Sequence, residues 1–275
     1  MTQDSTGRIE KMENKVERFP ILRLTEKGRS SIEDVVAREF PFTIILDNQE
    51  LVTLLCSPTN LKYLATGFLL SEGLLKSKNE IKKIIVDDRR GVARVETERD
   101  RELDRDVLFK RLITSGCGRG ASFYSAADAQ NQTKIESKIE VSILEVFTLV
   151  SEFQHHSQVY RATGGVHSAA LCDTKHILVF NEDIGRHNAV DKVIGECILN
   201  DISTDDHVII TSGRISSEIL LKVAKRNIPM IISKSAPTNL GVSLADDLGI
   251  TLIGFVRGKR MNVYTHEWRI KTNGK

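Results

Sequence analysis

Three short apolar runs that alternate with two amphipathic runs constrain the second half of the chain most strongly. We expect strands at residues 207–211, 230–233 and 250–256, with helices at 216–225 and 238–248 between them. An amphipathic helix between two buried strands indicates a parallel βαβ unit, because the helix carries the chain back along the sheet. This alternation predicts an α/β domain built on a parallel sheet.

The segment before these units is predicted to contribute two helices and a hairpin. Ser142 and Glu145 have the spacing of a capping box, which predicts a helix to about Phe153. Apolar runs at 167–172 and 177–180 predict a β-hairpin, followed by a helix at about 187–199.

The first half of the chain is predicted to be rich in β-strands. Apolar, β-branched runs at 42–46 and 50–55 are separated by turn residues and predict a hairpin. Two further strands are expected at 81–86 and 91–97. Between the two pairs, the Ser-Pro sequence at 57–58 predicts the start of a helix.

These patterns predict a mixed α/β chain with two domains, and 275 residues suffice for both. We expect residues 1–18 to be a flexible leader because they are polar and charged. Residues 19–135 are expected to form a smaller β-rich domain, and residues 136–275 an α/β domain.

Composition disfavours several classes of protein. Lys and Arg number 39 against 37 Asp and Glu, a net charge of +2, so no global charge indicates nucleic-acid binding. No stretch reaches the roughly 18–20 apolar residues of a membrane-spanning helix, and no secretory signal is visible. Four cysteines far apart, without an export signal, predict free thiols in a cytoplasmic protein.

Three turns rich in hydroxyl, glycine or basic residues follow the three expected parallel strands. Their sequences are TSGR at 211–214, SKSAPT at 233–238 and FVRGKR at 255–260. Ligands bind beside the carboxyl ends of parallel strands, and hydroxyls, helix N-termini and basic side chains suit phosphate groups. The alternative is that each turn is an ordinary loop and that FVRGKR is an exposed hairpin tip.

Cys117 is the best nucleophile that the sequence offers. Glycines flank it on both sides and Arg119 follows, so its sulfur is accessible and its thiolate is favoured. The other cysteines lie in apolar strand or helix patterns and are expected to be packed: Cys56, Cys172 and Cys197. The alternative is a chance occurrence of one cysteine in a glycine-rich loop.

A polar cluster at residues 162–195 includes His167, Asp183 and His187. It could form an acid–base site, or a buried hydrogen-bond network that fixes how a strand and a helix meet. We favour the structural network. No second ligand set that would complete a metal site is evident, so we expect no metal bound by protein side chains.

These motifs resemble those of the FdhD family, the formate dehydrogenase accessory sulfurtransferases. The matching stretches run in family order from about residue 40 to residue 270: LATGFLLSEGL, TSGCGRGAS, ATGGVHSAAL, NEDIGRHNAVDKVIG, TSGRISSE and SKSAPTNLGVSLADDLGITLIGFVRGKRMNVYTH. The resemblance implies a sulfur carrier that accepts sulfur from a cysteine desulfurase as a persulfide. It then passes the sulfur to the molybdenum cofactor, bis(molybdopterin guanine dinucleotide), before the cofactor enters formate dehydrogenase.

The resemblance also implies site residues, with Cys117 as the persulfide cysteine. The cofactor-binding segment would be Phe255, Val256, Arg257, Gly258, Lys259 and Arg260, with help from Arg214, Lys234 and Ser235. A GDP or GMP moiety is expected to bind at the same site. The alternative function is a non-catalytic chaperone that binds the cofactor without moving sulfur.

For the fold, the resemblance implies a cytidine deaminase-like α/β/α domain at the C-terminus, a smaller β-rich domain at the N-terminus, and a homodimer. Deaminase activity is not expected, because Ala169 stands where an HxE motif needs its glutamate and no PCxxC occurs. Gly120 stands where many relatives have a second loop cysteine. A persulfide relay needs one thiol, so Cys117 suffices, but no disulfide can form within the loop.

Overall fold

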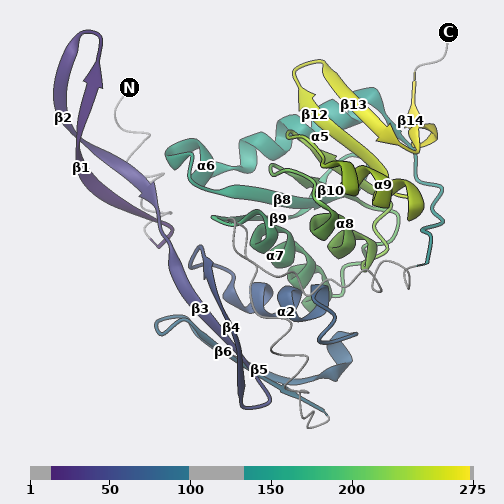
Figure 1. Ribbon diagram of the computed structural model, residues 1–275, viewed down its shortest axis with the longest axis horizontal. Helices are drawn as coiled ribbons and strands as arrows, with labels where there is room; N and C mark the ends of the chain where they lie inside the picture. Colours follow the sequence, from purple (N-terminus) through teal and green to yellow (C-terminus); the bar gives the residue numbers. More distant parts are fainter. Residues whose placement is uncertain (1–13, 99–132, 273–275) are drawn as a thin grey trace.

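The computed structural model describes residues 14–98 and 133–272, which form a smaller N-terminal part and a larger C-terminal part (Figure 1). The N-terminal elements are β1 (Val16–Thr25), β2 (Gly28–Ala37), β3 (Phe40–Leu46), β4 (Gln49–Cys56), α2 (Leu61–Ser71), η1 (Lys78–Glu80), β5 (Ile81–Asp87) and β6 (Val92–Thr97). The C-terminal elements are β7 (Val141–Ser142), α5 (Ile143–His156), α6 (Gln158–Thr163), β8 (His167–Cys172), β9 (Ile177–Asp183), α7 (Arg186–Leu199), β10 (Val208–Thr211), α8 (Ser217–Ala224), β11 (Met230–Ser233), α9 (Asn239–Asp247), β12 (Thr251–Arg257), β13 (Arg260–Thr265), η2 (Glu267–Arg269) and β14 (Ile270–Lys271). Of the helices described, none is long and apolar enough to cross a membrane.

A four-stranded sheet in the order β4-β3-β6-β5 forms the body of the N-terminal part. The predicted hairpin of β3 and β4 is confirmed. Its two-residue turn, Asp47 and Asn48, has φ angles of 44° and 65°, as a type I′ turn requires at both central positions. Asn and Asp tolerate this left-handed conformation better than other non-glycine residues.

Helix α2 covers this sheet, but it begins later than the sequence predicted. The predicted start at Ser57 is wrong, because the helix starts at Leu61 and its N-cap is Asn60. Ser57 is engaged elsewhere: its N–H donates to the Asp183 carboxylate and its Oγ accepts from Ile184 N. A distant part of the chain therefore takes the hydrogen-bonding groups that would have capped the helix.

The C-terminal part is a three-layer α/β/α structure, which confirms the expected fold class (Figure 1). Its six-stranded sheet has the order β13-β12-β11-β10-β8-β9, and β10, β11 and β12 are parallel, as predicted. Helices α7, α8 and α9 pack on one face of the sheet, and α5 packs on the other. The capping box at the start of α5 is present, with reciprocal bonds between Ser142 and Glu145.

Two observations bear on the expected domain limits. The supposed leader ended at residue 18, but β1 already begins at Val16, which is buried against the body. Ile135 was assigned to the first domain, but it packs in the core under the C-terminal sheet and its N–H donates to Leu248 O. Pairing with β2 extends β1 back to Val16, and contact with the core attaches Ile135 to the C-terminal part. Neither contact is evident from the local sequence.

The hairpin of β1 and β2 was not predicted, and it projects from the body as a separate arm (Figure 1). Only its base is packed, where Val16, Val35 and Ala37 contact Val159 and Val166. Beyond this base the strands are largely exposed. In β1 the apolar and polar residues do not alternate strictly, so the sequence carries no strong period-two signal for this strand.

Helices α2 and α7 join the two parts of the molecule, and glycines let them approach closely. A Cβ on Gly67 of α2 would lie 1.8 Å from the Asp191 carbonyl oxygen of α7, and one on Gly195 of α7 would lie 2.0 Å from Tyr63 O. Backbone atoms occupy both positions, so no side-chain rearrangement can make room. The orientation of the N-terminal sheet therefore depends on these two glycines.

We predict that Gly67→Ala lowers the free energy of unfolding by about 3 kcal/mol, the upper end of the usual cost of overpacking, because the new methyl group meets backbone. Chemical denaturation of the purified variant measures this change. Lys62→Ala, at an exposed position of the same helix, is the control and should stay within about 0.5 kcal/mol of the wild type. Equal stability of the two variants would contradict this account of the helix crossing.

Candidate functional site

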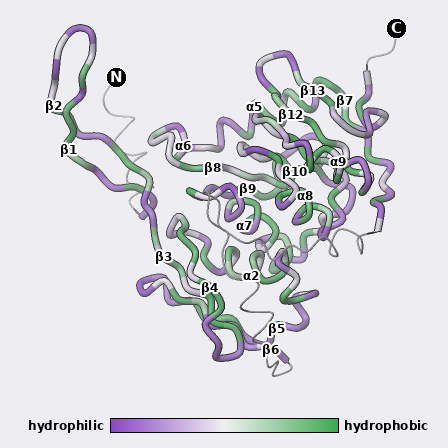
Figure 2. Tube along the Cα trace, viewed as in Figure 1, coloured by the Kyte–Doolittle hydropathy of each residue, from purple (hydrophilic) through white to green (hydrophobic). Residues whose placement is uncertain are grey.

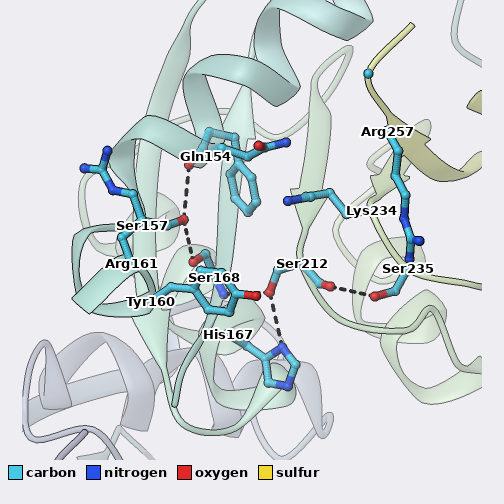
Figure 3. A pocket seen from close by; sticks show the side chains of 12 residues that line it. Gln154, Ser157, Tyr160, Arg161, His167, Ser168, Ser212, Lys234, Ser235 and Arg257 are labelled. Carbon is cyan, nitrogen blue, oxygen red and sulfur yellow. Dashed lines mark hydrogen bonds between the residues drawn. The ribbon is translucent and has the colours of Figure 1, made fainter. Parts of the chain in front are cut away.

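A cavity of about 630 Å³ opens where the carboxyl ends of β10, β11 and β12 face the end of α5 and the start of α6 (Figure 3). Its volume is typical of small-molecule sites. All three turns that were predicted to meet at this edge contribute to it, so their juxtaposition is confirmed. The lining residues are Phe153, Gln154, Ser157, Tyr160, Arg161, His167, Ser168, Ser212, Lys234, Ser235, Arg257 and Gly258.

Serine hydroxyls tie the turns after β10 and β11 together. Ser233 Oγ donates to Gly213 O at 2.7 Å. Ser235 Oγ donates to Ser212 O at 2.9 Å (Figure 3). A short parallel bridge between Ile215 and Pro237 continues this contact beyond the strands. The two turns are therefore held in one shape by bonds within the protein.

A bulge in β12 positions Arg257. The register with β13 is irregular between Gly254 and Arg257, and Phe255 has a φ of 54°. A bulky residue rarely adopts this left-handed conformation, which costs about 1–3 kcal/mol. The Phe255 N–H donates to Ser235 O at 3.2 Å, which attaches the bulge to the neighbouring turn. Bulges of this kind redirect the side chains beside them, here that of Arg257.

The lining of the cavity is positively charged. Lys234 and Arg257 project from the strand ends and Arg161 lies across from them, while no carboxylate occurs among the described lining residues (Figure 3). Burial and the positive charge of Arg257 lower the pKa of Lys234. Two cations that repel one another without a carboxylate nearby favour an anion in the space between them.

His167 lies at the edge of the cavity in a neutral state. Burial and the charges of Arg186 and Arg214 lower the pKa of this imidazole. Its Nδ1 lies 3.2 Å from Ser212 Oγ, which also accepts from Ser168 N. The Ser212 hydroxyl can therefore donate to a neutral His167, and the pair contributes polar but uncharged groups to the cavity.

The structure separates the residues that were expected to bind the cofactor. Four of them line the cavity: Lys234, Ser235, Arg257 and Gly258. Lys259 and Arg260 instead line a second groove of about 540 Å³ beside α5 and β13. Val256 is buried in the core, because neighbouring residues of a strand point to opposite faces.

Three further predicted residues have other positions. Phe255 forms the bulge described above. Arg214 is exposed and does not line the cavity, although its charge acts on His167. Cys117 lies outside the described residues, so its role and its place relative to the cavity stay predictions.

Sequence reasoning missed the opposite wall of the cavity, which comes from the junction of α5 and α6. Gln154, Ser157, Tyr160 and Arg161 lie there. The first helix was expected to end near Phe153, but α5 continues to His156 and a second short helix follows. Ser157 is the signal that could have indicated a new helix, because serine favours N-cap positions.

The polar cluster around Asp183 forms a buried network between the two parts of the molecule, of the kind that the sequence analysis favoured. Asp183 is fully buried and lies 2.6 Å from Lys192 Nζ. It also accepts from Ser57 N and Asn188 Nδ2. Because Lys192 Nζ donates to Ser57 O as well, the segment between β4 and α2 is held from both sides.

A second buried ion cluster joins three helices. Lys222 of α8 lies 2.9 Å from the Asp191 carboxylate of α7 and 2.8 Å from that of Glu72, just after α2. These carboxylates raise the pKa of Lys222, which therefore stays charged despite its burial. The cluster reinforces the contact between α2 and α7.

His187 is buried between these clusters, and its environment keeps it neutral. Burial, helped by the charges of Lys222 and Arg186, lowers the pKa of His187 to about 3. Glu218 lies 3.4 Å from His187 Nε2, but at neutral pH the two do not form an ion pair because the imidazole is uncharged. A histidine with so low a pKa is poorly suited to proton transfer near pH 7.

Comparison with known proteins decides the family. The sequence model of the FdhD/NarQ family matches residues 37–271, a range that includes the four-stranded sheet, the six-stranded sheet and the lining of the cavity. The chain belongs to the FdhD/NarQ family. Within the described ranges, no group of three or more His, Cys, Asp or Glu side chains is arranged to hold a metal ion.

Among relatives of this FdhD/NarQ chain are proteins named sulfur carrier protein FdhD. That of Bacillus pumilus (strain SAFR-032) is 45% identical over 237 residues, covering 86% of this chain and 90% of the relative. Those of Bacillus subtilis (strain 168) and Staphylococcus aureus (strain JH9) are 45% and 43% identical, covering 90% and 91% of this chain and 94% and 95% of the relatives.

A solved structure has the same FdhD/NarQ architecture. It is a protein from Desulfotalea psychrophila that is provisionally assigned as a formate dehydrogenase accessory protein. The two chains are 27% identical with a TM-score of 0.78, and the match covers 94% of this chain and all of the other. The likeness therefore extends over both parts of the molecule.

We predict a pH dependence of stability that comes from His187. Its pKa is about 3 in the folded protein and near 6.5 when unfolded, so the unfolded state binds more protons between these values. Folding stability therefore falls as the pH decreases from 6.5 towards 3. By pH 5 the loss from this one group should reach about 2 kcal/mol.

Denaturation of the wild type and of His187→Gln at pH 7 and pH 5 measures this effect. The variant should lose about 2 kcal/mol less than the wild type over this interval. Parallel pH profiles for the two proteins would show that His187 does not titrate as described. The comparison of slopes is independent of any packing change that the substitution causes.

Proposed function

We propose that this protein is a sulfur carrier for formate dehydrogenase and that it delivers sulfur to the molybdenum cofactor of that enzyme. The names of the relatives support the general role, since they are called sulfur carriers or assigned as formate dehydrogenase accessory proteins. The observation that carries the cofactor part is the cavity in which Lys234 and Arg257 meet without a carboxylate among the described lining residues.

In this proposal the cofactor, bis(molybdopterin guanine dinucleotide), binds as a substrate through its phosphates. Lys234 and Arg257 would form charge-assisted bonds with the phosphate oxygens, and the Ser235 hydroxyl lies beside them in the same turn. The turns are already fixed by their own hydrogen bonds, so little conformational entropy is lost on binding. Free GDP carries the same diphosphate and is therefore a suitable probe.

The sulfur step uses Cys117. Its thiolate attacks the terminal sulfur of a persulfide on the donor, which we propose is a cysteine desulfurase. A new S–S bond forms on Cys117, the donor's S–S bond breaks, and the donor leaves as a thiolate. The reduced molybdenum centre of the substrate cofactor would then supply an electron pair to the outer sulfur of the Cys117 persulfide. A bond from that sulfur to molybdenum would form, the S–S bond would break, and Cys117 would leave as a thiolate; the two electrons that bring the sulfur to the sulfide level would come from the metal.

A homodimeric assembly is part of the same proposal. Gly120 leaves the segment 113–122 with one cysteine, so sulfur release by disulfide formation within that segment is excluded. Each subunit would therefore carry one sulfur at a time on Cys117.

We predict that Arg257→Ala weakens GDP binding by about 10- to 100-fold, because a charged hydrogen bond to phosphate is lost. Arg260→Ala is the matched control from the same hairpin, since Arg260 lies in the other groove, and it should change the affinity less than threefold. Calorimetric titration of both variants with GDP measures the difference. An equal loss for both would show that the cavity is not the phosphate site.

We predict that incubation with a cysteine desulfurase and cysteine adds one reducible sulfur atom to Cys117. Mass spectrometry of the intact protein and of its peptides measures this gain. Cys56, Cys172 and Cys197 are buried, and burial raises their thiol pKa values, so they serve as internal controls that should stay unmodified.

Cys117→Ala should abolish both the sulfur gain and the activation of formate dehydrogenase. Full activation by this variant would overturn the sulfur-transfer step and leave a chaperone that binds the cofactor without moving sulfur. GDP binding by the variant should equal that of the wild type, which separates the two functions.

A further inference from the structure

The β1–β2 arm exposes large apolar side chains far from the core. Leu22 and Leu24 near its tip are 56% and 72% exposed, and Phe19 and Val36 are each almost half exposed. Figure 2 shows hydrophobic stretches along the arm, outside the body of the protein. Exposed apolar residues gathered on one projecting element indicate a contact surface for another molecule.

The arm gains little stability from its own contacts. A two-stranded ribbon with no third strand or helix against it is marginally stable in water. The cross-strand ion pairs Arg18–Glu33 and Arg23–Asp34 span 3.5 and 3.8 Å and are exposed, so they contribute little. Only the base of the arm is buried against the body. Binding of a partner to the outer part would bury its apolar side chains and so stabilise the ribbon.

The arm tip, defined here as residues 22–29, combines its leucines with positive charge. It contains three cations against one carboxylate: Arg23, Lys27 and Arg29 against Glu26. The whole chain is almost neutral by comparison. A surface that complements the tip is therefore an apolar depression with an acidic rim.

Side chains, rather than added strands, are suited to make the contact. Pro20 in the middle of β1 has no N–H, so it interrupts the row of donors that another strand would use. This disfavours extension of the ribbon along β1 by a second copy of the chain. It leaves the faces, the tip and the outer edge of β2 as the parts that another protein can contact.

The base of the arm lies next to the wall of the cavity. Val35 and Ala37 of β2 pack against Val159 of α6, and the next two residues of that helix, Tyr160 and Arg161, line the cavity. A protein that binds the tip and extends along the arm to its base would therefore reach the side of the molecule on which the cavity wall of α6 lies.

We propose that the arm tip is the docking surface for the protein that receives the ligand of the cavity, and that it fits an apolar depression with an acidic rim on that protein. This inference rests on the proposed function, in which the receiver is formate dehydrogenase without its cofactor. Two leucines supply the buried contact, and Lys27 and Arg29 supply the charge complementarity.

The test compares binding of purified, cofactor-free formate dehydrogenase catalytic subunit to the wild type and to three variants by biolayer interferometry. Leu22→Ser with Leu24→Ser should reduce affinity at least tenfold. Lys27→Glu with Arg29→Glu should also reduce it at least tenfold, and the remaining binding should depend less on salt. Leu55→Ser is the matched control, since Leu55 is 51% exposed but lies on β4, and it should bind as the wild type does.

GDP titration and mass measurement in solution complete the test. Unchanged GDP binding by the arm variants shows that the cavity is intact, and wild-type GDP binding tests the proposed function separately. Unchanged binding of the arm variants to formate dehydrogenase, or no binding by the wild type, would overturn the docking proposal. A shift of the arm variants to a smaller oligomer would overturn it too, because the arm would then hold a second copy of the chain.

Discussion

The buried ion pair between Asp183 and Lys192 is the interaction on which the arrangement of the two sheets depends. It holds the connection between β4 and α2 through Ser57, and so sets where α2 meets α7. Breaking such a pair by removing one partner typically costs about 3–5 kcal/mol, because the other charge stays buried. Asp183 of β9 also lies opposite His167 in the antiparallel pairing of β8 and β9, and His167 lines the cavity. The same strand pair therefore contributes to the contact between the two parts of the molecule and to the cavity.

Hydrogen bonds between uncharged groups fix the turns that form the cavity, and Lys234 and Arg257 make its lining positively charged. Serine hydroxyls fix the turns after β10 and β11, and the bulge at Phe255 brings the third turn to them. Because these contacts form within the protein, Lys234 and Arg257 are held near each other before any ligand arrives. Such pre-arranged charges bind anions with little reorganisation, which suits the proposed uptake and release of a large anionic substrate.

The sequence was sufficient for the parallel strands, their helices and the meeting of three turns at one edge, because hydrophobic period and βαβ connection follow from local pattern. The predictions from sequence were wrong or incomplete where contacts with residues far away in the chain determine the local structure. The start of α2 moved because the Asp183 carboxylate accepts the Ser57 N–H. The cavity wall from α6 was missed because its local signal, Ser157, is weak: serine is as common in turns as at helix starts, and this one makes no side-chain capping bond. The basic segment at 255–260 was treated as one unit, whereas strand alternation and the hairpin turn send its side chains to the cavity, the core and a second groove.

The left-handed Phe255 places a local cost inside the site. Glycine adopts a φ of 54° without strain, so phenylalanine at this position carries a backbone cost that glycine would not. Glycine would also free the backbone that aims Arg257 and remove the aromatic ring 5.9 Å from its guanidinium. Relief of backbone strain and the proposed binding of an anion by Arg257 therefore favour different residues at position 255, and a relative that did not bind this anion would be expected to lose the phenylalanine.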